Sequence, residues 1–203
     1  MCIPVNPKLD PAREERSPVK LNMGCGHNKV PGYLNVDLSA ECTPDYVCDL
    51  EVLPWIWPDH SVDAVRFNHC LEHLGQESKV FLGMMKELYR VCKNESKIEI
   101  NVPHPKHDNF LGDPTHVRVI TPEVLSLFDK RLNDEWKKTG AANTPLAHYL
   151  GVDFAISKFK TVLDEPYGKL FASGKITGPD MEVIVRERNN VVSEFRIELT
   201  VRK

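Results

Sequence analysis

The stretch that most constrains the fold is 19–37, which reads VKLNMGCGHNKVPGYLNVD. A short apolar strand at 19–23 runs into a Gly-Cys-Gly loop at 24–26, and a second strand at 33–36 delivers a carboxylate at Asp37. Glycines let the backbone approach a ligand closely, and an acidic residue after the next strand can accept both hydroxyls of a ribose. This order predicts a nucleoside ligand across the carboxyl ends of parallel strands. A glycine pair alone is a weak signal, so the features that follow it decide its weight.

Strands and helices alternate over the next hundred residues. The hydrophobic pattern predicts strands at 46–48, 62–67 and 97–102 and helices at 77–92 and 121–130. This alternation predicts an α/β chain with a mostly parallel sheet. Pro31-Gly32 interrupts any helix between the first two strands, so the first crossover helix is expected to be shortened or absent.

The C-terminal third has a different pattern. Residues 152–163 are expected to form a strand, and the Gly- and Pro-containing segment 164–180 is expected to be a connection. Two β-type runs, 181–188 and 191–201, flank Asn189-Asn190, which predicts an antiparallel hairpin at the edge of the sheet. We therefore expect a single domain over 19–203, preceded by an extended arm at 1–18 with four prolines.

Composition narrows the class of protein. With 26 basic and 29 acidic residues the net charge is −3, and the sequence has no stripe of basic residues of the kind that binds nucleic acid. The chain has no apolar run long enough for a membrane span and no secretory signal near its start, so we expect no membrane partner and a cytoplasmic location. The six cysteines contain no Cys-x-x-Cys pair, which favours reduced, packed thiols.

The ordered motifs resemble one family. GCG, NVD, DLE with LP, FNHCLEHL and MKELYRVCKNESKIEINVPHP follow one another over about residues 19–128. This series is similar to the class I S-adenosylmethionine-dependent methyltransferases, especially the branch with a Leu-Glu-His motif after strand four. That branch includes quinone-biosynthesis and many small-molecule and glycan methyltransferases. The resemblance implies a Rossmann-like fold, S-adenosyl-L-methionine as cofactor and methyl transfer as activity.

The resemblance also implies which residues bind the cofactor. The loop at the end of the first strand would approach the methionine part, Asp37 would hold the ribose hydroxyls, and the next two strands would supply the remaining contacts. The residues carried over in this way are Gly24, Cys25, Gly26, Asp37, Asp49, Leu50, Asn68 and His69. The missing first helix departs from the family pattern, because its N-terminus normally faces the cofactor carboxylate, and 129–203 matches no subfamily.

Histidines gather where this fold exposes the carboxyl edge of its sheet. They follow the fourth strand at 69 and 73 and the fifth at 104, 107 and 116. A nucleophile that carries a proton needs a base tuned near neutral pH, for which histidine is the usual choice. The catalytic candidates are His69, His116 and Asp113. Each could instead be structural: His73 a local hydrogen-bonding group, and 113–116 a simple Asx-type turn.

The same loop allows a metal site as an alternative. Its nitrogen and oxygen ligands, sufficient for a divalent ion, come from His104, His107, Asp108, Asp113 and His116. No established ligand spacing is matched, so the favoured interpretation assigns no metal.

Several functions stay open. The preferred one is methyl transfer to an O or N nucleophile of a small molecule or glycan precursor, with a possible homodimer through the C-terminal hairpin. A nicotinamide-dependent oxidoreductase shares the glycine loop but would need x-x-Gly and a helix after it. A non-catalytic nucleotide-binding module would be favoured by an exposed apolar face at Trp55 and Trp57, although we interpret 53–61 as a buried plug rather than a lid. A methyltransferase that modifies DNA bases would be expected to carry an Asn/Asp-Pro-Pro-aromatic motif or a Pro-Cys pair, and this chain has neither.

Overall fold

The computed structural model describes residues 2–5 and 18–203 of the chain. Most of the arm expected at 1–18 lies outside the described residues. Within the described part, the fold is built on one eight-stranded sheet with the order β1-β4-β3-β2-β5-β6-β8-β7. The strands are β1 (Ile3–Pro4), β2 (Val19–Met23), β3 (Leu34–Asp37), β4 (Tyr46–Val47), β5 (Val62–Asn68), β6 (Cys92–Pro103), β7 (Phe154–Leu163) and β8 (Val192–Val201).

Five neighbouring strands of this sheet are parallel. β4 pairs with β3, β3 with β2, β2 with β5 and β5 with β6, so their carboxyl ends share one edge. The connections through residues 24–61, all of which are described, contain no α-helix, only the 3-10 turn η1 (Ala40–Cys42). The prediction of a shortened first crossover is therefore confirmed.

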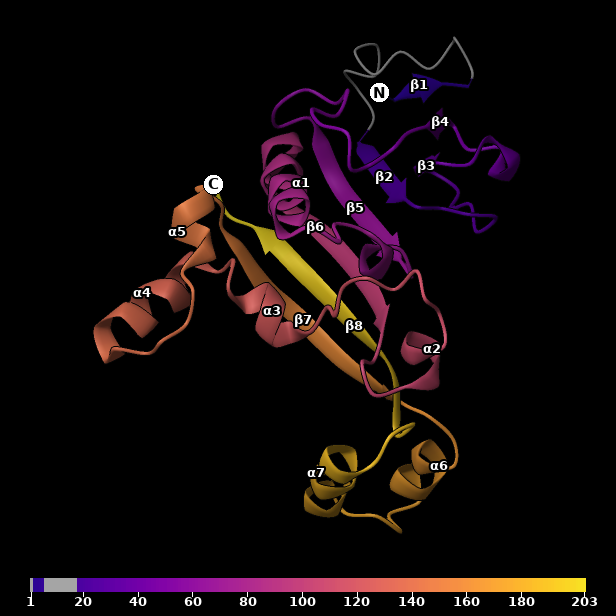
Figure 1. The fold of residues 1–203 in the computed structure, drawn as a ribbon, viewed down its shortest axis with the longest axis vertical. Coiled ribbons are helices and arrows are strands. Elements are labelled where there is room, and N and C mark those ends of the chain that lie inside the picture. Colours follow the sequence, from indigo (N-terminus) through magenta and orange to yellow (C-terminus); the bar gives the residue numbers. More distant parts are fainter. Residues whose placement is uncertain (1, 6–17) are drawn as a thin grey trace.

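Seven helices of the described residues accompany the sheet. They are α1 (Ser78–Val91), α2 (Asp108–Leu111), α3 (Pro122–Ser126), α4 (Lys130–Thr139), α5 (Leu146–Leu150), α6 (Tyr167–Ala172) and α7 (Gly178–Glu187). In Figure 1, α1 and α3 lie on the same face of the sheet, while α6 and α7 hang below its end. The predicted helix at 121–130 is shorter, because the chain turns at 127–129 and Asp129 caps the separate helix α4.

Alternation along the central strands explains the core. In β5, Val62, Val65 and Phe67 are buried, while Arg66 and Asn68 are only partly covered on the opposite face. β6 repeats the pattern, because Ile98, Ile100 and Val102 are fully buried between polar residues. One face of the sheet therefore packs against α1 and α3, and the other carries charged and polar side chains.

The predicted hairpin of 181–188 with 191–201 is wrong. Residues 178–187 form α7, and β8 pairs antiparallel with β7 on one side and with β6 on the other. The β-type run at 181–188 beside Asn189-Asn190 predicts a strand, but Thr177 caps a helix with Pro179 in its first turn, and only Met181 of that helix is buried. The antiparallel edge itself is confirmed, with a long connection holding α6 and α7 in place of a tight turn.

The expectation of six reduced thiols is also wrong. Cys2 and Cys48 are joined by a disulfide, which spans 46 positions of sequence. The reason lies in the register of β1, which pairs antiparallel with β4 so that Ile3 faces Val47. The two cysteines then stand opposite each other, with their Cα atoms 4.1 Å apart. Cysteines 25, 42, 70 and 92 are free.

The tryptophan-rich segment after β4 is a buried plug, as expected. Trp55 is 3% and Trp57 1% exposed, and the Trp55 indole donates to the Leu50 carbonyl oxygen at 3.0 Å. Trp57 packs edge-on against Tyr46 with ring centroids 5.9 Å apart. No helix among the described residues is long and apolar enough to cross a membrane.

Candidate functional site

A cavity of about 350 Å³ opens at the shared carboxyl edge of the parallel strands. Its lining comes from the residues that follow β2, β3, β4 and β5, together with the 3-10 turn η2 (Leu71–His73). The lining residues are Gly24, Gly26, Asp37, Leu38, Cys48, Asp49, Leu50, His69, Cys70, His73 and Leu74. Six of the eight positions predicted to bind the cofactor thus line one cavity.

Two glycines shape the floor of this cavity. Gly24 and Gly26 have φ angles of +65° and +50°, the left-handed region that favours glycine. A Cβ atom on Gly24 would lie 2.1 Å from the Cys70 sulfur, so the loop after β2 packs directly on the loop after β5. A Cβ atom on Gly26 would meet no atom of the described residues within 4 Å, so the space beside its Cα atom is open.

The two predicted carboxylates face the same cavity. Asp37 accepts hydrogen bonds from the Gly26 amide at 2.7 Å and the Ser39 amide at 2.9 Å. Asp49 accepts one from the Glu51 amide at 2.9 Å. Each carboxylate is therefore oriented by backbone and keeps lone pairs for a ligand, since an ionised carboxylate has about four acceptor positions.

Two of the predicted cofactor residues do not line the cavity. Cys25 is 4% exposed, and burial raises the pKa of its thiol to about 11, so the residue is a packed neutral thiol. The Asn68 side chain accepts from the Asn101 amide at 2.9 Å. Asn68 is the last residue of β5, and its side chain lies on the same face of the sheet as Arg66, whose guanidinium donates to it at 3.5 Å.

His69 enters the cavity from the end of β5. Its Nε2 atom donates to Glu194 of β8 at 3.0 Å, and its Nδ1 atom lies 3.6 Å from the Glu72 carboxylate. Its backbone is left-handed, with φ of 51°, and its amide donates to the Asn101 carbonyl oxygen. The Glu72 carboxylate, aided by Glu194 and opposed by burial, raises the pKa of His69.

The other two catalytic candidates stand behind His73. The His116 ring packs edge-on against the His73 ring with centroids 4.5 Å apart. Asp113 accepts from the Thr115 hydroxyl at 2.6 Å, and Thr115 in turn contacts Nδ1 of His73 at 2.9 Å. His116 and Asp113 therefore contact the cavity wall through His73 rather than lining it.

The structure separates the metal-ligating set that the sequence suggested. His107 pairs with Asp164 at 2.9 Å, and the His104 ring packs against Phe195. Within residues 2–5 and 18–203, only one group of three metal-capable side chains has its ligand atoms together, and it consists of Glu72, His73 and His116.

Sequence reasoning missed two acidic residues of the site. Glu194 reaches His69 from β8, 125 positions away, and no local pattern announces such a contact. Glu72 is 1% exposed, which a glutamate in a Leu-Glu-His turn does not reveal by itself. Its position beside His73 is the signal that could have identified Glu72, because both residues belong to the turn that follows β5.

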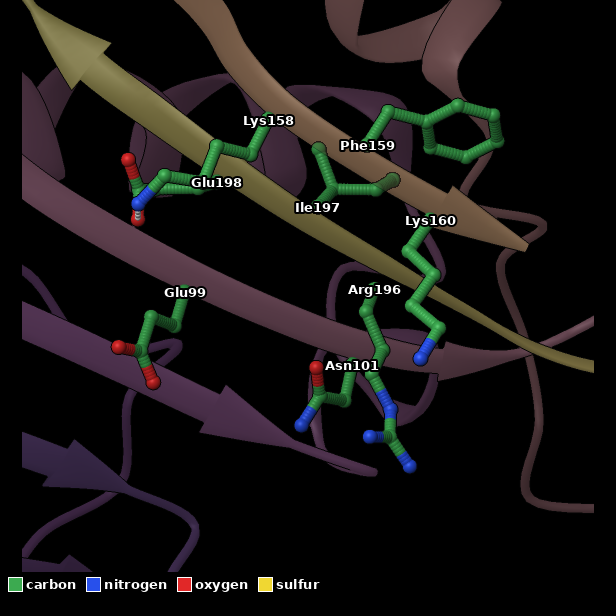
Figure 2. A pocket seen from close by; sticks show the side chains of 8 residues that line it. All are labelled: Glu99, Asn101, Lys158, Phe159, Lys160, Arg196, Ile197 and Glu198. Atoms are coloured by element: carbon green, nitrogen blue, oxygen red, sulfur yellow. Dashed lines mark hydrogen bonds and ion pairs between the residues drawn. The ribbon is translucent and has the colours of Figure 1, made fainter. Parts of the chain in front are cut away.

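A larger hollow of about 460 Å³ lies elsewhere, on the charged face of the sheet. Figure 2 shows its side chains standing on β6, β7 and β8, with the Arg196 guanidinium beside Asn101. Both acidic and basic groups line it, and none of the predicted site residues is among them. The candidate site is therefore the cavity at the carboxyl edge.

Comparison with solved structures identifies the fold. A SAM-dependent methyltransferase from Archaeoglobus fulgidus superposes with a TM-score of 0.54 at 19% identity, covering 94% of this chain and 92% of that one. A SAM-dependent methyltransferase from Methanosarcina mazei gives 0.52 at 14% identity, covering 98% of each chain. A variant of the 16S rRNA (adenine(1408)-N(1))-methyltransferase from Catenulisporales acidiphilia gives 0.52 at 14%, covering 96% and 93%.

No family model and no curated protein matches the chain. At these identities the structural likeness shows the fold alone. The chain has the Rossmann-like α/β fold of SAM-dependent methyltransferases, with a mostly parallel sheet and antiparallel C-terminal strands.

Proposed function

We propose that this protein is an S-adenosyl-L-methionine-dependent methyltransferase that methylates an O or N nucleophile of a small molecule or glycan precursor. The observation that carries the proposal is the single cavity in which Gly26, Asp37, Asp49 and His69 meet at the carboxyl edge of four parallel strands. In open α/β sheets, ligands bind at this edge. The Leu71-Glu72-His73 turn beside the cavity supports the Leu-Glu-His branch of the family.

The cavity residues fit an adenosyl ligand. Asp37 would accept hydrogen bonds from the two ribose hydroxyls, and Asp49 would accept one from the adenine amino group. The Leu50 backbone would lie beside the adenine ring. The open space over Gly26 leaves room for the methionine part. The volume of about 350 Å³ falls in the range of small-molecule sites, about 300–1,000 Å³. When bound, the cofactor supplies an electrophilic methyl group on a sulfonium.

His69 is the residue best placed to take a proton from the acceptor. It lines the cavity, and its Nε2–H donates to Glu194, which leaves Nδ1 as the nitrogen that accepts a proton. The carboxylates of Glu194 and Glu72 stabilise the imidazolium that forms, as a carboxylate does for a catalytic histidine elsewhere. Asp113 and His116 act as positioning residues, because they contact the cavity through Thr115 and His73.

Holding the acceptor against the methyl donor supplies much of the rate. Pre-orientation in a site closed to water contributes about 7–11 kcal/mol to reactions of this kind. Leu50 and Cys70, which are buried, and Leu74, which is partly buried, give the cavity lining apolar surface. His69 and His73 are polar groups of the same lining.

A small acceptor is favoured over nucleic acid by charge. The net charge is −3, and the charged sheet face mixes Glu99 and Glu198 with Arg196 and two lysines. Such a mixture is not the basic stripe that binds a phosphate backbone. The non-catalytic alternative gains nothing from Trp55 and Trp57, which are buried. A homodimer through the C-terminal strands would use β7, the edge strand of the sheet.

Isothermal titration calorimetry tests the proposal. S-adenosylmethionine and S-adenosylhomocysteine are expected to bind one per chain, and NAD is not. A panel of hydroxyl and amine acceptors with labelled methyl donor then reports turnover. Tight cofactor binding with no transfer to any acceptor would favour the non-catalytic module, and NAD binding in place of S-adenosylmethionine would reject the proposal.

A further inference from the structure

Three side chains beside the cavity form a cluster whose ligand-type atoms have no assigned role of their own beyond their contacts with His69 and the cavity wall. Glu72, His73 and His116 each offer one ligand atom, and these atoms all lie within 4.8 Å of one another. Two backbone hydrogen bonds hold the segments together, because the Glu72 carbonyl oxygen accepts from the amides of Val117 and Arg118 at 3.0 Å each. The cluster is therefore fixed by the fold.

The Glu72 carboxylate has no hydrogen-bond partner among the described residues. The side chain is 1% exposed, and its charged neighbour there is the His69 ring. The nearest basic nitrogen is Nδ1 of His69 at 3.6 Å, which is beyond hydrogen-bond distance. Burying an ionised carboxylate without compensation is costly, so such groups are normally paired or coordinate a metal.

Both imidazoles are oriented as metal ligands are. Nδ1 of His116 contacts the Phe110 carbonyl oxygen at 2.9 Å, so this nitrogen carries the proton and donates it. The Thr115 hydroxyl donates to Asp113 and therefore accepts from Nδ1 of His73 at 2.9 Å. In both rings Nε2 is then the nitrogen with the lone pair, and Nε2 of His116 lies 3.9 Å from the Asp113 carboxylate, too far for a hydrogen bond. Metal-binding histidines show this arrangement, with the second nitrogen donating to a carbonyl, hydroxyl or carboxylate.

We propose that Glu72, His73 and His116 bind a divalent first-row transition metal ion such as zinc or iron(II). Two imidazoles and one carboxylate are a ligand set for these ions, whereas magnesium and calcium prefer oxygen ligands. Because the three ligand atoms lie within 4.8 Å of one another, an ion placed between them would be no more than about 2.8 Å from each. Each ligand atom would then have to move about 0.7 Å toward the ion to reach the usual bond length of about 2.1 Å.

The ion would lie at the wall of the cavity. His73 lines the cavity, so a coordination position without a protein ligand would open toward it. Three protein ligands with one open position is the pattern of catalytic rather than structural metal sites. The inference concerns metal binding alone, and it stands whether or not methyl transfer is the activity.

Metal titration of tag-free, chelator-stripped protein tests the inference. Co²⁺ is expected to produce visible absorption bands that saturate at one ion per chain, and Zn²⁺ to compete for the same site. Added Zn²⁺ is also expected to raise the melting temperature, since a ligand that binds only the native state stabilises it. No saturable binding of either ion, or binding without spectral change, would overturn the inference.

Variants identify the ligands. Glu72→Gln and His116→Asn are expected to weaken Co²⁺ binding at least about 100-fold, and Thr115→Val, which removes the partner of His73, about 10–100-fold. His148→Asn is the matched control, because His148 also pairs with a carboxylate, that of Asp134 at 2.8 Å, but belongs to α5.

The second control is a histidine of the 104–116 loop that the sequence offered as an alternative metal ligand. His104→Asn is expected to bind Co²⁺ as the wild type does. Circular dichroism establishes whether each variant is folded. If Glu72→Gln does not fold, the Co²⁺ affinities of His116→Asn and Thr115→Val decide whether the inference holds. Wild-type affinity in the folded variants at positions 72, 115 and 116 would overturn the inference.

Discussion

The Oδ2 atom of Asp37 accepts a hydrogen bond of 2.7 Å from the backbone amide of Gly26. This contact ties the end of β3 to the loop after β2, so the two elements that the sequence predicted to hold one ligand are joined before any ligand binds. The other carboxylate oxygen accepts from the Ser39 amide at 2.9 Å. The orientation of the Asp37 carboxylate is thus fixed by the backbone, which reduces the entropy lost on binding a ribose.

Asp37→Ala is expected to abolish binding of S-adenosylmethionine. The substitution removes the acceptor for two ribose hydroxyls, and hydrogen bonds to a charged group contribute about 1.5–3 kcal/mol each, so affinity should fall at least about 100-fold. Calorimetry measures the change. Asp63→Asn is the matched control, because Asp63 also accepts from a backbone amide, that of Val19 at 2.8 Å, but at the amino end of the strands. Wild-type affinity in the Asp37 variant would mean that the ribose site is misplaced.

Two glycine variants separate fold from site. Gly24→Val is expected to abolish cofactor binding, but its Cβ would clash with Cys70, so the variant should also lose thermal stability. Gly26→Ala adds its methyl group to open space, though at a positive φ, and should weaken binding with a smaller change in melting temperature. Thermal melts and calorimetry of both variants provide the comparison. An unchanged cofactor affinity in Gly26→Ala would remove the space beside Gly26 from the cofactor site.

Two histidine variants test the roles at the cavity. His69→Asn removes the proposed base and should lower turnover by about 10²–10⁴. His116→Ala should also lower turnover while leaving cofactor affinity unchanged, because His116 reaches the cavity only through His73. Turnover at saturating cofactor, with affinity measured separately, distinguishes these effects. Equal turnover of wild type and His116→Ala would remove His116 from the mechanism.

Alkylation of the four free cysteines tests the thiol environments. Burial raises the pKa of Cys25 to about 11, that of Cys92 to about 12 and that of Cys70 still further, so their thiols stay protonated and covered in the native protein. Because the thiolate is the reactive form, iodoacetamide at about pH 8 should label Cys42, which is partly exposed, well before the other three. Peptide mass spectrometry gives the order, and denatured protein should show no such preference. Labelling of Cys25 as fast as Cys42 would contradict the buried position of the loop.

Much of the fold could be predicted because its signals are local. The apolar run of β2, the helical spacing of Phe81, Met85 and Leu88 in α1, and the alternation of β8 each bury one face, so short-range periodicity matches the tertiary outcome. The cavity residues after β2, β3 and β4 were predictable for the same reason, since parallel strands bring their carboxyl ends to one edge.

The remaining features depend on contacts between distant residues. The β-branched run Val183-Ile184-Val185 before the Asn189-Asn190 turn predicts a strand, whereas the segment is the helix α7, which Thr177 caps and which buries only Met181. The disulfide of Cys2 with Cys48 depends on the pairing of β1 with β4, which the sequence does not indicate. Asn68 is predicted to lie beside the methionine end of the cofactor, and the structure shows its side chain bonded to that of Asn101 and outside the cavity lining.

A crystal structure with S-adenosylhomocysteine tests the central claim most directly. The account predicts adenosine in the cavity, with the ribose hydroxyls on the Asp37 carboxylate, the adenine amino group near Asp49, and the sulfur directed toward His69. Nucleoside density on the charged sheet face near Arg196, or a ribose in the cavity that does not contact Asp37, would contradict it.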